Sequence, residues 1–191
     1  MTAGSPFTVK VTAEDANGNV ATSFSGSVTL TVAGPSNSWL GGKSAIVVKA
    51  VRGVATFAGL KLALAGSNYS LTATTGTLTA TTNAFPVAAG AATYLKITQQ
   101  PLSSVSAGIA FGLVVTAFDA YNNVANTFSG KVTLTAISPG LSPLSGTTTM
   151  SPTNGVFTFT ALMLDIPGGY VIQAKSGKLK GAQTNSFTVT S

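Results

Sequence analysis

The chain has 191 residues, a formal net charge of +6 and only 7% charged residues, a length that suits one large domain or two of ordinary size. It contains no cysteine and no histidine, which excludes thiolate metal sites and thiol nucleophiles and removes the commonest general base. Only four acids remain, namely Glu14, Asp15, Asp119 and Asp165, so we expect that the protein is not an enzyme.

The first half reads as a series of short strands. Apolar and polar residues alternate over residues 7–13, as they do along a strand with one buried face. The same period of two recurs over 28–32, 55–57, 69–73 and 85–87, and Gly, Asn and Pro separate these runs. No stretch keeps a helical period. The pattern predicts an all-β, antiparallel sandwich.

The second half repeats the first. Residues 13–21 match 117–125, 24–31 match 128–135, 53–57 match 155–159, and 82–85 match 184–187. The period of about 102 residues is too long for a solenoid unit and suits a whole domain. We therefore predict two tandem immunoglobulin-like sandwiches, over residues 1–88 and 89–191.

The seam between the halves is rich in alanine and glycine. Residues 86–92 read Pro-Val-Ala-Ala-Gly-Ala-Ala, which offers few side chains for packing. We interpret this stretch as a short linker, and its shortness favours a stiff pair over a loose one.

The two halves differ at their starts. The second opens with an alternating run, Thr93–Pro101, ahead of Gly108, whereas only Met1, Thr2 and Ala3 precede Gly4 in the first. The first sandwich is therefore predicted to lack its leading strand and to have an open edge. Truncation of a longer array explains this, and so does strand addition by another chain.

Two motifs resemble a known family. Residues 4–16 and 108–120 share a Gly-x-x-Phe start and an Asp-Ala end, and both are followed by Phe-Ser-Gly-x-Val-Thr-Leu. This pattern resembles bacterial immunoglobulin-like repeats of the invasin and intimin type and, more distantly, filamin repeats. The resemblance implies an exported protein, neighbouring immunoglobulin-like repeats in the same chain, and a role in adhesion or cell-surface structure.

A polar turn in each copy is a candidate metal site. Asp15, Asn17 and Asn19 have the alternate oxygen spacing of a calcium loop, although no downstream Glu completes it. Alternatively Asp15, like Asp119 in the second copy, caps backbone N–H groups in a turn between strands. Apart from such a calcium ion, no cofactor is expected.

Three aromatic residues are further candidates. Tyr69 and Tyr170 follow glycines at the start of a late strand, which is typical of a tyrosine corner, although an exposed aromatic could instead bind a ligand. Trp39, the only tryptophan, lies in a loop with no counterpart in the second copy. It either stacks on a sugar ring or folds over the end of the sandwich.

Partners follow from charge and hydropathy. Apart from Lys175, Lys178 and Lys180, the basic residues are scattered, so no nucleic-acid partner is expected. No apolar run approaches the ~20 residues that span a bilayer, so no membrane insertion is expected. We expect any export signal to lie upstream of these residues.

The sequence therefore predicts a non-catalytic structural or adhesive repeat pair of a larger extracellular or cell-surface protein. Its partners would be neighbouring repeats and cell-surface glycans or proteins. One alternative is a carbohydrate-binding accessory module of a secreted enzyme. Another is a unit that self-assembles by strand addition at the open first sandwich, although the isolated pair is expected to be a monomer.

Overall fold

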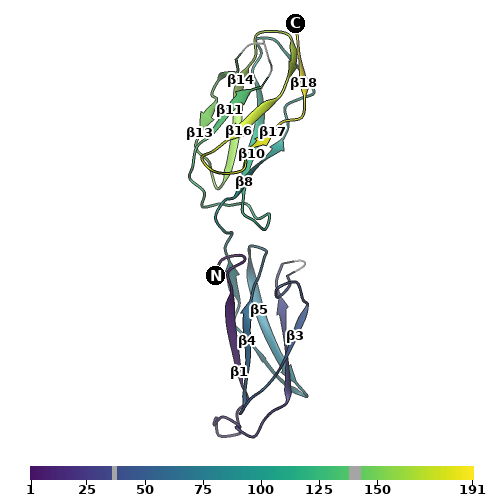
Figure 1. Ribbon diagram of the computed structural model, residues 1–191, viewed down its shortest axis with the longest axis vertical. Helices are drawn as coiled ribbons and strands as arrows, with labels where there is room; N and C mark the ends of the chain where they lie inside the picture. The colour runs from purple at the N-terminus through teal and green to yellow at the C-terminus, as the bar shows by residue number, and fades with distance from the viewer. Residues whose placement is uncertain (36–37, 138–142) are drawn as a thin grey trace. The chain divides into compact units, whose positions relative to one another are not determined.

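The computed structural model describes residues 1–35, 38–137 and 143–191 (Figure 1). All regular elements among these residues are β-strands, which confirms the predicted all-β fold class. The chain divides into two compact units, Met1–Gly90 and Ala91–Ser191, here called unit 1 and unit 2. No helix in the described residues is long and apolar enough to cross a membrane.

Unit 1 consists of two sheets. The smaller one pairs β1 (Phe7–Thr12) antiparallel with β4 (Val54–Leu60). The larger one has the order β3-β2-β5-β6, and β7 also pairs with β5. Its strands are β2 (Ser27–Ala33), β3 (Ala45–Lys49), β5 (Gly66–Thr75), β6 (Leu78–Thr81) and β7 (Phe85–Val87).

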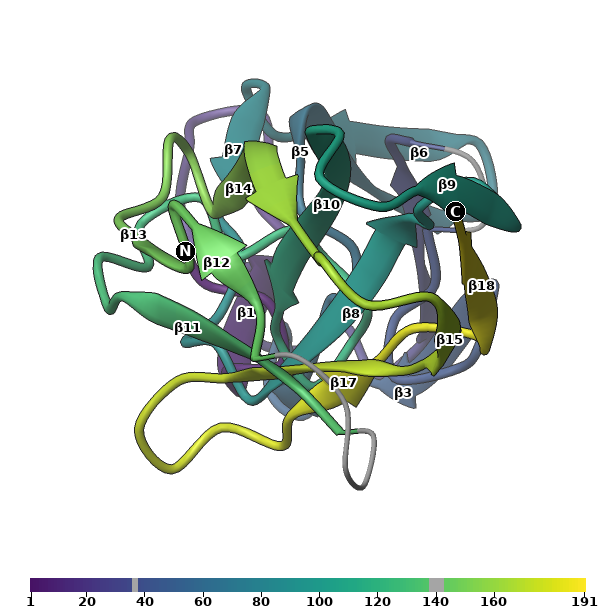
Figure 2. The same ribbon diagram turned by 90° about the horizontal axis from the view of Figure 1, so that it is seen from above.

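Unit 2 repeats this plan with additional strands. Its three sheets have the orders β12-β14-β10-β8, β13-β11-β16-β17 and β15-β18-β9. The strands are β8 (Tyr94–Gln99), β9 (Ser104–Ser106), β10 (Phe111–Phe118), β11 (Val132–Ala136), β12 (Ser145–Gly146), β13 (Thr149–Met150), β14 (Val156–Met163), β15 (Gly168–Tyr170), β16 (Ile172–Lys175), β17 (Ala182–Gln183) and β18 (Phe187–Thr190). Figure 2 shows β8 lying alongside β10, with which it pairs.

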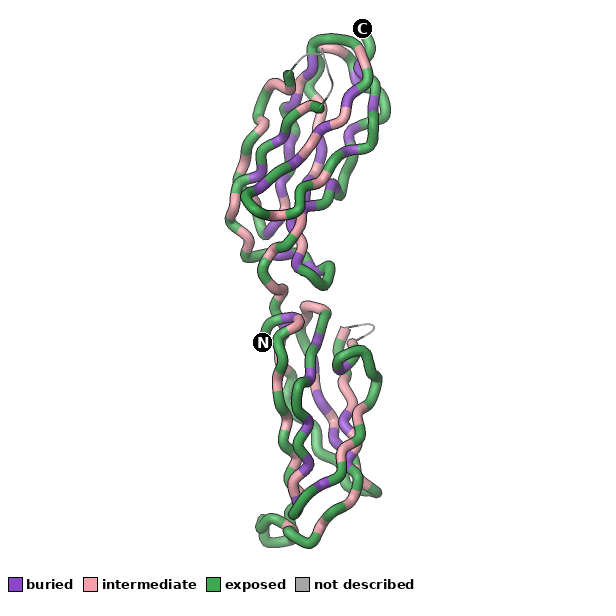
Figure 3. Tube along the Cα trace, viewed as in Figure 1, coloured by how far each residue is buried: buried purple, intermediate pink, exposed green. Residues whose placement is uncertain are grey.

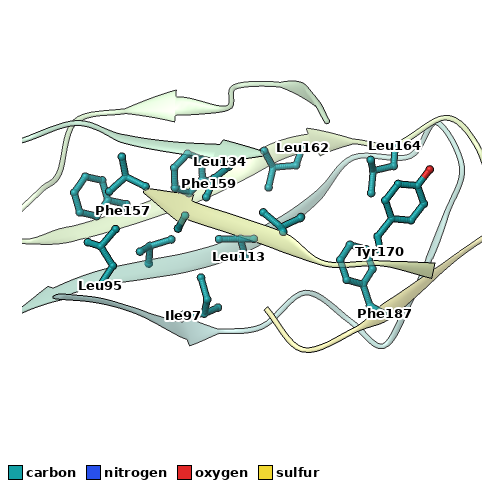
Figure 4. Packing of buried hydrophobic residues seen from close by; sticks show 14 of the residues in the cluster. Leu95, Ile97, Leu113, Leu134, Phe157, Phe159, Leu162, Leu164, Tyr170 and Phe187 are labelled. Carbon is teal, nitrogen blue, oxygen red and sulfur yellow. The ribbon is translucent and has the colours of Figure 1, made fainter. Parts of the chain in front are cut away.

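Each unit has its own hydrophobic core, because many apolar residues of the alternating strands are buried, and Figure 3 shows these buried residues along the strands of both units. In unit 2 the side chains of Leu113, Phe157 and Phe159 meet between the sheets and are at most 1% exposed (Figure 4). In unit 1 Phe57 and Leu30 have the same role, each 1% exposed. The alternation of apolar and polar residues along each strand, rather than any longer motif, therefore determines which side chains form the cores.

A two-residue hairpin precedes β4 and β14. Arg52 and Gly53 have φ of 51° and 84°, and Asn154 and Gly155 have φ of 50° and 77°. Two successive positive φ angles are typical of a type I′ turn, whose twist suits a tight hairpin. A Cβ on Gly155 would lie 2.6 Å from the carbonyl oxygen of Ala125, so only glycine fits there.

The predicted linker is wrong for its first three residues. Pro86 and Val87 belong to β7, and Val87 pairs with Gly66 and is 3% exposed. Ala88 donates its N–H to the carbonyl oxygen of Met1 at 2.8 Å and accepts from Ala3 N at 2.8 Å. These backbone hydrogen bonds hold the segment against unit 1, although its side chains are small.

Candidate functional sites

The Asp turn of unit 1 is held together by its own hydrogen bonds. Oδ1 of Asp15 accepts from the backbone N–H groups of Asn17 and Asn19, both at 2.9 Å. Oδ2 accepts from the side-chain amide of Asn19 at 3.2 Å. Gly18 completes the turn at φ 81°. These contacts have the geometry of a capped turn.

Unit 2 builds the same turn around Asp119. Oδ1 of Asp119 accepts from the N–H groups of Tyr121 at 2.8 Å and Asn123 at 2.9 Å, and Oδ2 accepts from Asn123 Nδ2 at 2.8 Å. Asn122 occupies the position of Gly18 and has φ 66°. Gly and Asn are the residues that adopt a positive φ most readily, which explains why glycine in one turn and asparagine in the other occupy this position.

The two turns differ in burial. Asp119 is 1% exposed and Asn123 is 9% exposed, whereas Asp15 and Asn19 are both exposed. Strand β8 accounts for the difference, because the hydroxyl of Tyr94 donates to Oδ1 of Asn122 and its ring stacks on Phe118, with centroids 5.5 Å apart. Unit 1 has no such strand among the described residues beside its turn.

The electrostatics of Asp15 follow from these contacts. The N–H of Asn19, its side-chain amide and the N–H of Asn17 all donate to the carboxylate and hold the pKa of Asp15 below its usual value of 3.8. In the described parts of the chain, no group of three or more Asp, Glu, His or Cys side chains lies together. Calcium binding by Asp15, Asn17 and Asn19 stays a prediction.

The two candidate corner tyrosines are buried. Tyr69 is 0% exposed and Tyr170 is 1% exposed, so neither ring is accessible to a ligand. The hydroxyl of Tyr69 donates to the carbonyl oxygen of Leu64 at 2.8 Å, and that of Tyr170 donates to Ile166 at 2.8 Å. Each hydroxyl thus ties its strand to the connection a few residues upstream, as in a tyrosine corner.

Trp39 is half-exposed at the end of a loop. Its side chain is 52% exposed, whereas that of its neighbour Leu40 is 1% exposed and packs into the core of unit 1. The hydroxyl of Ser38 donates to the carbonyl oxygen of Pro35, which fixes one side of the loop. The indole is therefore available for stacking, as a sugar-binding residue would need to be.

A cleft opens between the two sheets of unit 1, which sequence reasoning did not anticipate. It runs between β1 and β6, and one part of it has a volume of about 340 Å³. A second part, of about 150 Å³, lies next to the Asp turn and is mostly apolar. Residues that line both parts include Val11, Thr12, Glu14, Ala73 and Ala80. The predicted open edge of the first sandwich offered the only signal for this cleft.

Comparisons with known proteins find structural likeness alone. Neither protein-family models nor curated proteins match this sequence. Solved structures that are similar include domains 4 and 5 of the S-layer protein SbsC, at 19% identity over 70% of both chains and a TM-score of 0.41. Invasin, a bacterial integrin-binding protein, is 17% identical over 99% of this chain and 37% of its own, with a TM-score of 0.43.

A β-glycosidase from Bacteroides vulgatus is also similar, at 12% identity over 96% of this chain and 25% of its own, with a TM-score of 0.44. This chain thus spans well under two thirds of invasin and of the glycosidase. None of the three places the chain in a family.

Proposed function

We propose that the chain is a non-catalytic structural or adhesive segment, a pair of immunoglobulin-like repeats that acts as a spacer or cell-surface interaction segment of a larger extracellular protein. One observation supports this most directly. Both units contain the same two devices, a buried corner tyrosine and an Asp-headed turn, and the tyrosine hydroxyls and aspartate carboxylates are engaged in internal hydrogen bonds.

The proposal assigns these devices a mechanical role. A corner tyrosine and a capped turn hold the connections between sheets, which are the parts of a sandwich that open first when they are not fixed. Repetition of a small, self-contained unit extends a chain at constant stability per unit. It also multiplies weak contacts to neighbouring repeats or to cell-surface glycans and proteins.

Single-molecule force spectroscopy on the full chain tests the spacer role. Two separate unfolding events are expected, one for each unit. Tyr69→Phe should lower the force of one event and Tyr170→Phe that of the other, because each variant loses one hydroxyl bond in one core. A single cooperative event, or smooth extension without peaks, would contradict the proposal.

The exposed indole of Trp39 supports a second candidate, a carbohydrate-binding accessory module. A glycan array would detect this function. Binding that Trp39→Ala abolishes and Tyr121→Ala leaves intact would favour it, because Tyr121 is a comparably exposed aromatic, 39% against 52% for Trp39. Absence of binding by the unaltered chain would exclude the sugar-binding role and leave the spacer role standing.

A further inference from the structure

Unit 2 contains a strand that unit 1 does not show in the described residues. Strand β8 pairs antiparallel with β10, with Ile97 opposite Val115 and Leu95 opposite Ala117. It also reaches the other sheet, because Leu95 donates its N–H to the carbonyl oxygen of Lys180 at 2.8 Å. Strand β8 thus closes the gap between two sheets. Strand β1, the counterpart of β10, pairs only with β4 among the described residues.

The cleft of unit 1 lies where β8 lies in unit 2. Its walls are β1, the counterpart of β10, and β6, whose Ala80 and Thr81 align with Ala182 and Gln183 of β17. The alignment is fixed by a shared contact, since Thr82 and Thr184 both accept through Oγ1 from a buried backbone N–H of the neighbouring strand, at 3.0 and 2.9 Å.

Equivalent residues of the two units differ in exposure at the cleft. Val115 and Ala117 are 0% exposed in unit 2, whereas their counterparts Val11 and Ala13 are only half-buried. Thr184 is 6% exposed, whereas Thr82 is exposed.

The same holds at the turn beside β6. Leu179 packs against the core of unit 2, whereas Leu78, which follows the equivalent glycine turn, is 65% exposed. Unit 1 thus exposes the apolar surface that its duplicate covers with β8.

We propose that the cleft between β1 and β6 of unit 1 binds an extended polypeptide strand, supplied from outside residues 1–191, that adds antiparallel to β1 in the register of β8. An unpaired strand edge offers free backbone N–H and C=O groups to such a strand, and the apolar cleft takes its inward side chains. This inference is independent of the spacer role.

The side chains of β1 specify the chemistry of the strand. Positions opposite Val11 and Ala13 take aliphatic residues, as Ile97 and Leu95 occupy the matching places in unit 2. In unit 2, Phe118 lies opposite Tyr94 of β8 and stacks on it. Glu14 is the counterpart of Phe118 in unit 1, so the residue of the bound strand that lies opposite Glu14 should be a cation instead of an aromatic residue.

The far end of the register differs as well. Lys10 is the counterpart of Val114, which lies opposite Gln99 of β8 in unit 2. The residue of the bound strand that lies opposite Lys10 should therefore be acidic. Lys10 and Glu14 are both exposed, and such pairs set register and partner choice more than affinity. The cleft is therefore built for a strand that reads cation, aliphatic, any residue, aliphatic, any residue, and then an acid.

Peptide binding to the full chain tests this inference. The probe is a synthetic peptide with the sequence of residues 93–101 carrying Tyr94→Lys and Gln99→Glu. Hydrogen exchange should show slowed amides in β1 and in β6, and no change in β10 of unit 2. The unchanged peptide should bind about fivefold more weakly, since it lacks both charges. A peptide with Leu95→Asp and Ile97→Asp should not bind.

A charge reversal keeps the test decisive without disturbing the core. The chain variant Glu14→Lys changes an exposed side chain, and it should reverse the preference in favour of a peptide with Tyr94→Glu. Equal binding of both peptides by both chains would overturn the proposed register. Failure of the charge-matched peptide to protect β1 would overturn the proposal.

Two further measurements test a strand attached ahead of Met1 and a second copy of the chain as occupants of the cleft. Met1 aligns with Val105, so a copy of residues 93–104 placed ahead of Met1 supplies the equivalent of β8 to unit 1. This copy should raise the midpoint of thermal unfolding of unit 1. An unchanged midpoint contradicts the proposal. Sedimentation should show a monomer at all concentrations. A concentration-dependent dimer that protects β1 would make a second copy the occupant and would overturn the assignment to an outside strand.

Discussion

The phenol oxygen of Tyr94 lies 2.5 Å from Oδ1 of Asn122, and this contact ties β8 to the turn that Asp119 heads. The turn of unit 1, which Asp15 heads with the same internal hydrogen bonds, has no such strand beside it in the described residues. Two turns with matching internal hydrogen bonds therefore have different surroundings, one buried and one in solvent. The difference makes the pair a natural comparison for the energetics of a capped turn.

Asparagine substitution in the two turns should have unequal effects. Asp119→Asn replaces a buried carboxylate that accepts three hydrogen bonds and should lower the free energy of unfolding of unit 2 by about 1.5–3 kcal/mol. Asp15→Asn should destabilise unit 1 less, because water can substitute for the lost contacts. Urea denaturation measures both. A larger effect at Asp15 would contradict the role that we assign to β8.

The depressed pKa of Asp15 predicts an acid-sensitive turn. A carboxyl whose pKa is lower in the folded than in the unfolded chain adds stability above its unfolded pKa, and that stability is lost as the pH falls through the folded pKa. The carboxyl resonance of Asp15 should therefore titrate below pH 3.8. Asp15→Asn should remove this part of the pH dependence of unit 1. Titration at or above the usual value would show that the turn is open in solution.

The corner tyrosines should be worth a measurable part of each unit's stability. Tyr170→Phe removes the hydroxyl that donates to the carbonyl oxygen of Ile166 and should cost about 0.5–1.5 kcal/mol, since one part-buried hydrogen bond is lost. Tyr121→Phe, at an exposed side chain, is the matched control and should be neutral. Chemical denaturation followed by tyrosine fluorescence distinguishes them. Equal midpoints for the two variants would remove the structural role from Tyr170.

The hairpin glycine should not tolerate a side chain. Gly155→Ala places a Cβ 2.6 Å from a backbone oxygen at φ 77° and should destabilise unit 2 by at least about 1 kcal/mol. Gly169→Ala is the control, because its Cβ would meet no atom within 4 Å. Thermal unfolding of both variants provides the test. A neutral Gly155→Ala would mean that the hairpin relaxes freely.

Much of this structure could be predicted from the residues. Alternation over residues 7–13 and 155–159 determines which side chains enter the cores, because strand periodicity acts locally. The short sequence between Gly66 and Tyr69 likewise predicted a corner. The linker was misassigned over Pro86–Ala88, because small side chains suggest weak packing whereas backbone hydrogen bonds decide the contact.

The remaining features depend on contacts between residues distant in the sequence. Asp15 and Asp119 head turns with the same internal hydrogen bonds, and their burial differs because Tyr94 packs near only one of them. Val11 and Ala80 line the same cleft although they are far apart in the sequence, so the alternation of residues within one strand does not predict that they lie close together. A predicted open edge could indicate its existence but not the groups that line it.

Strand β9 and the last strand of unit 2, β18, run in the same direction. Strand β9 is parallel to β18, with Ser104 opposite Thr188 and Ser106 opposite Thr190. A pull on the start of β9 and on the end of β18 therefore slides these two strands along each other, so that their hydrogen bonds are sheared together instead of unzipping one at a time. The short parallel bridge between Thr2 and Ala88 gives unit 1 the same geometry. Shear of this kind therefore acts between the first and last paired residues of unit 1 and between β9 and β18 of unit 2.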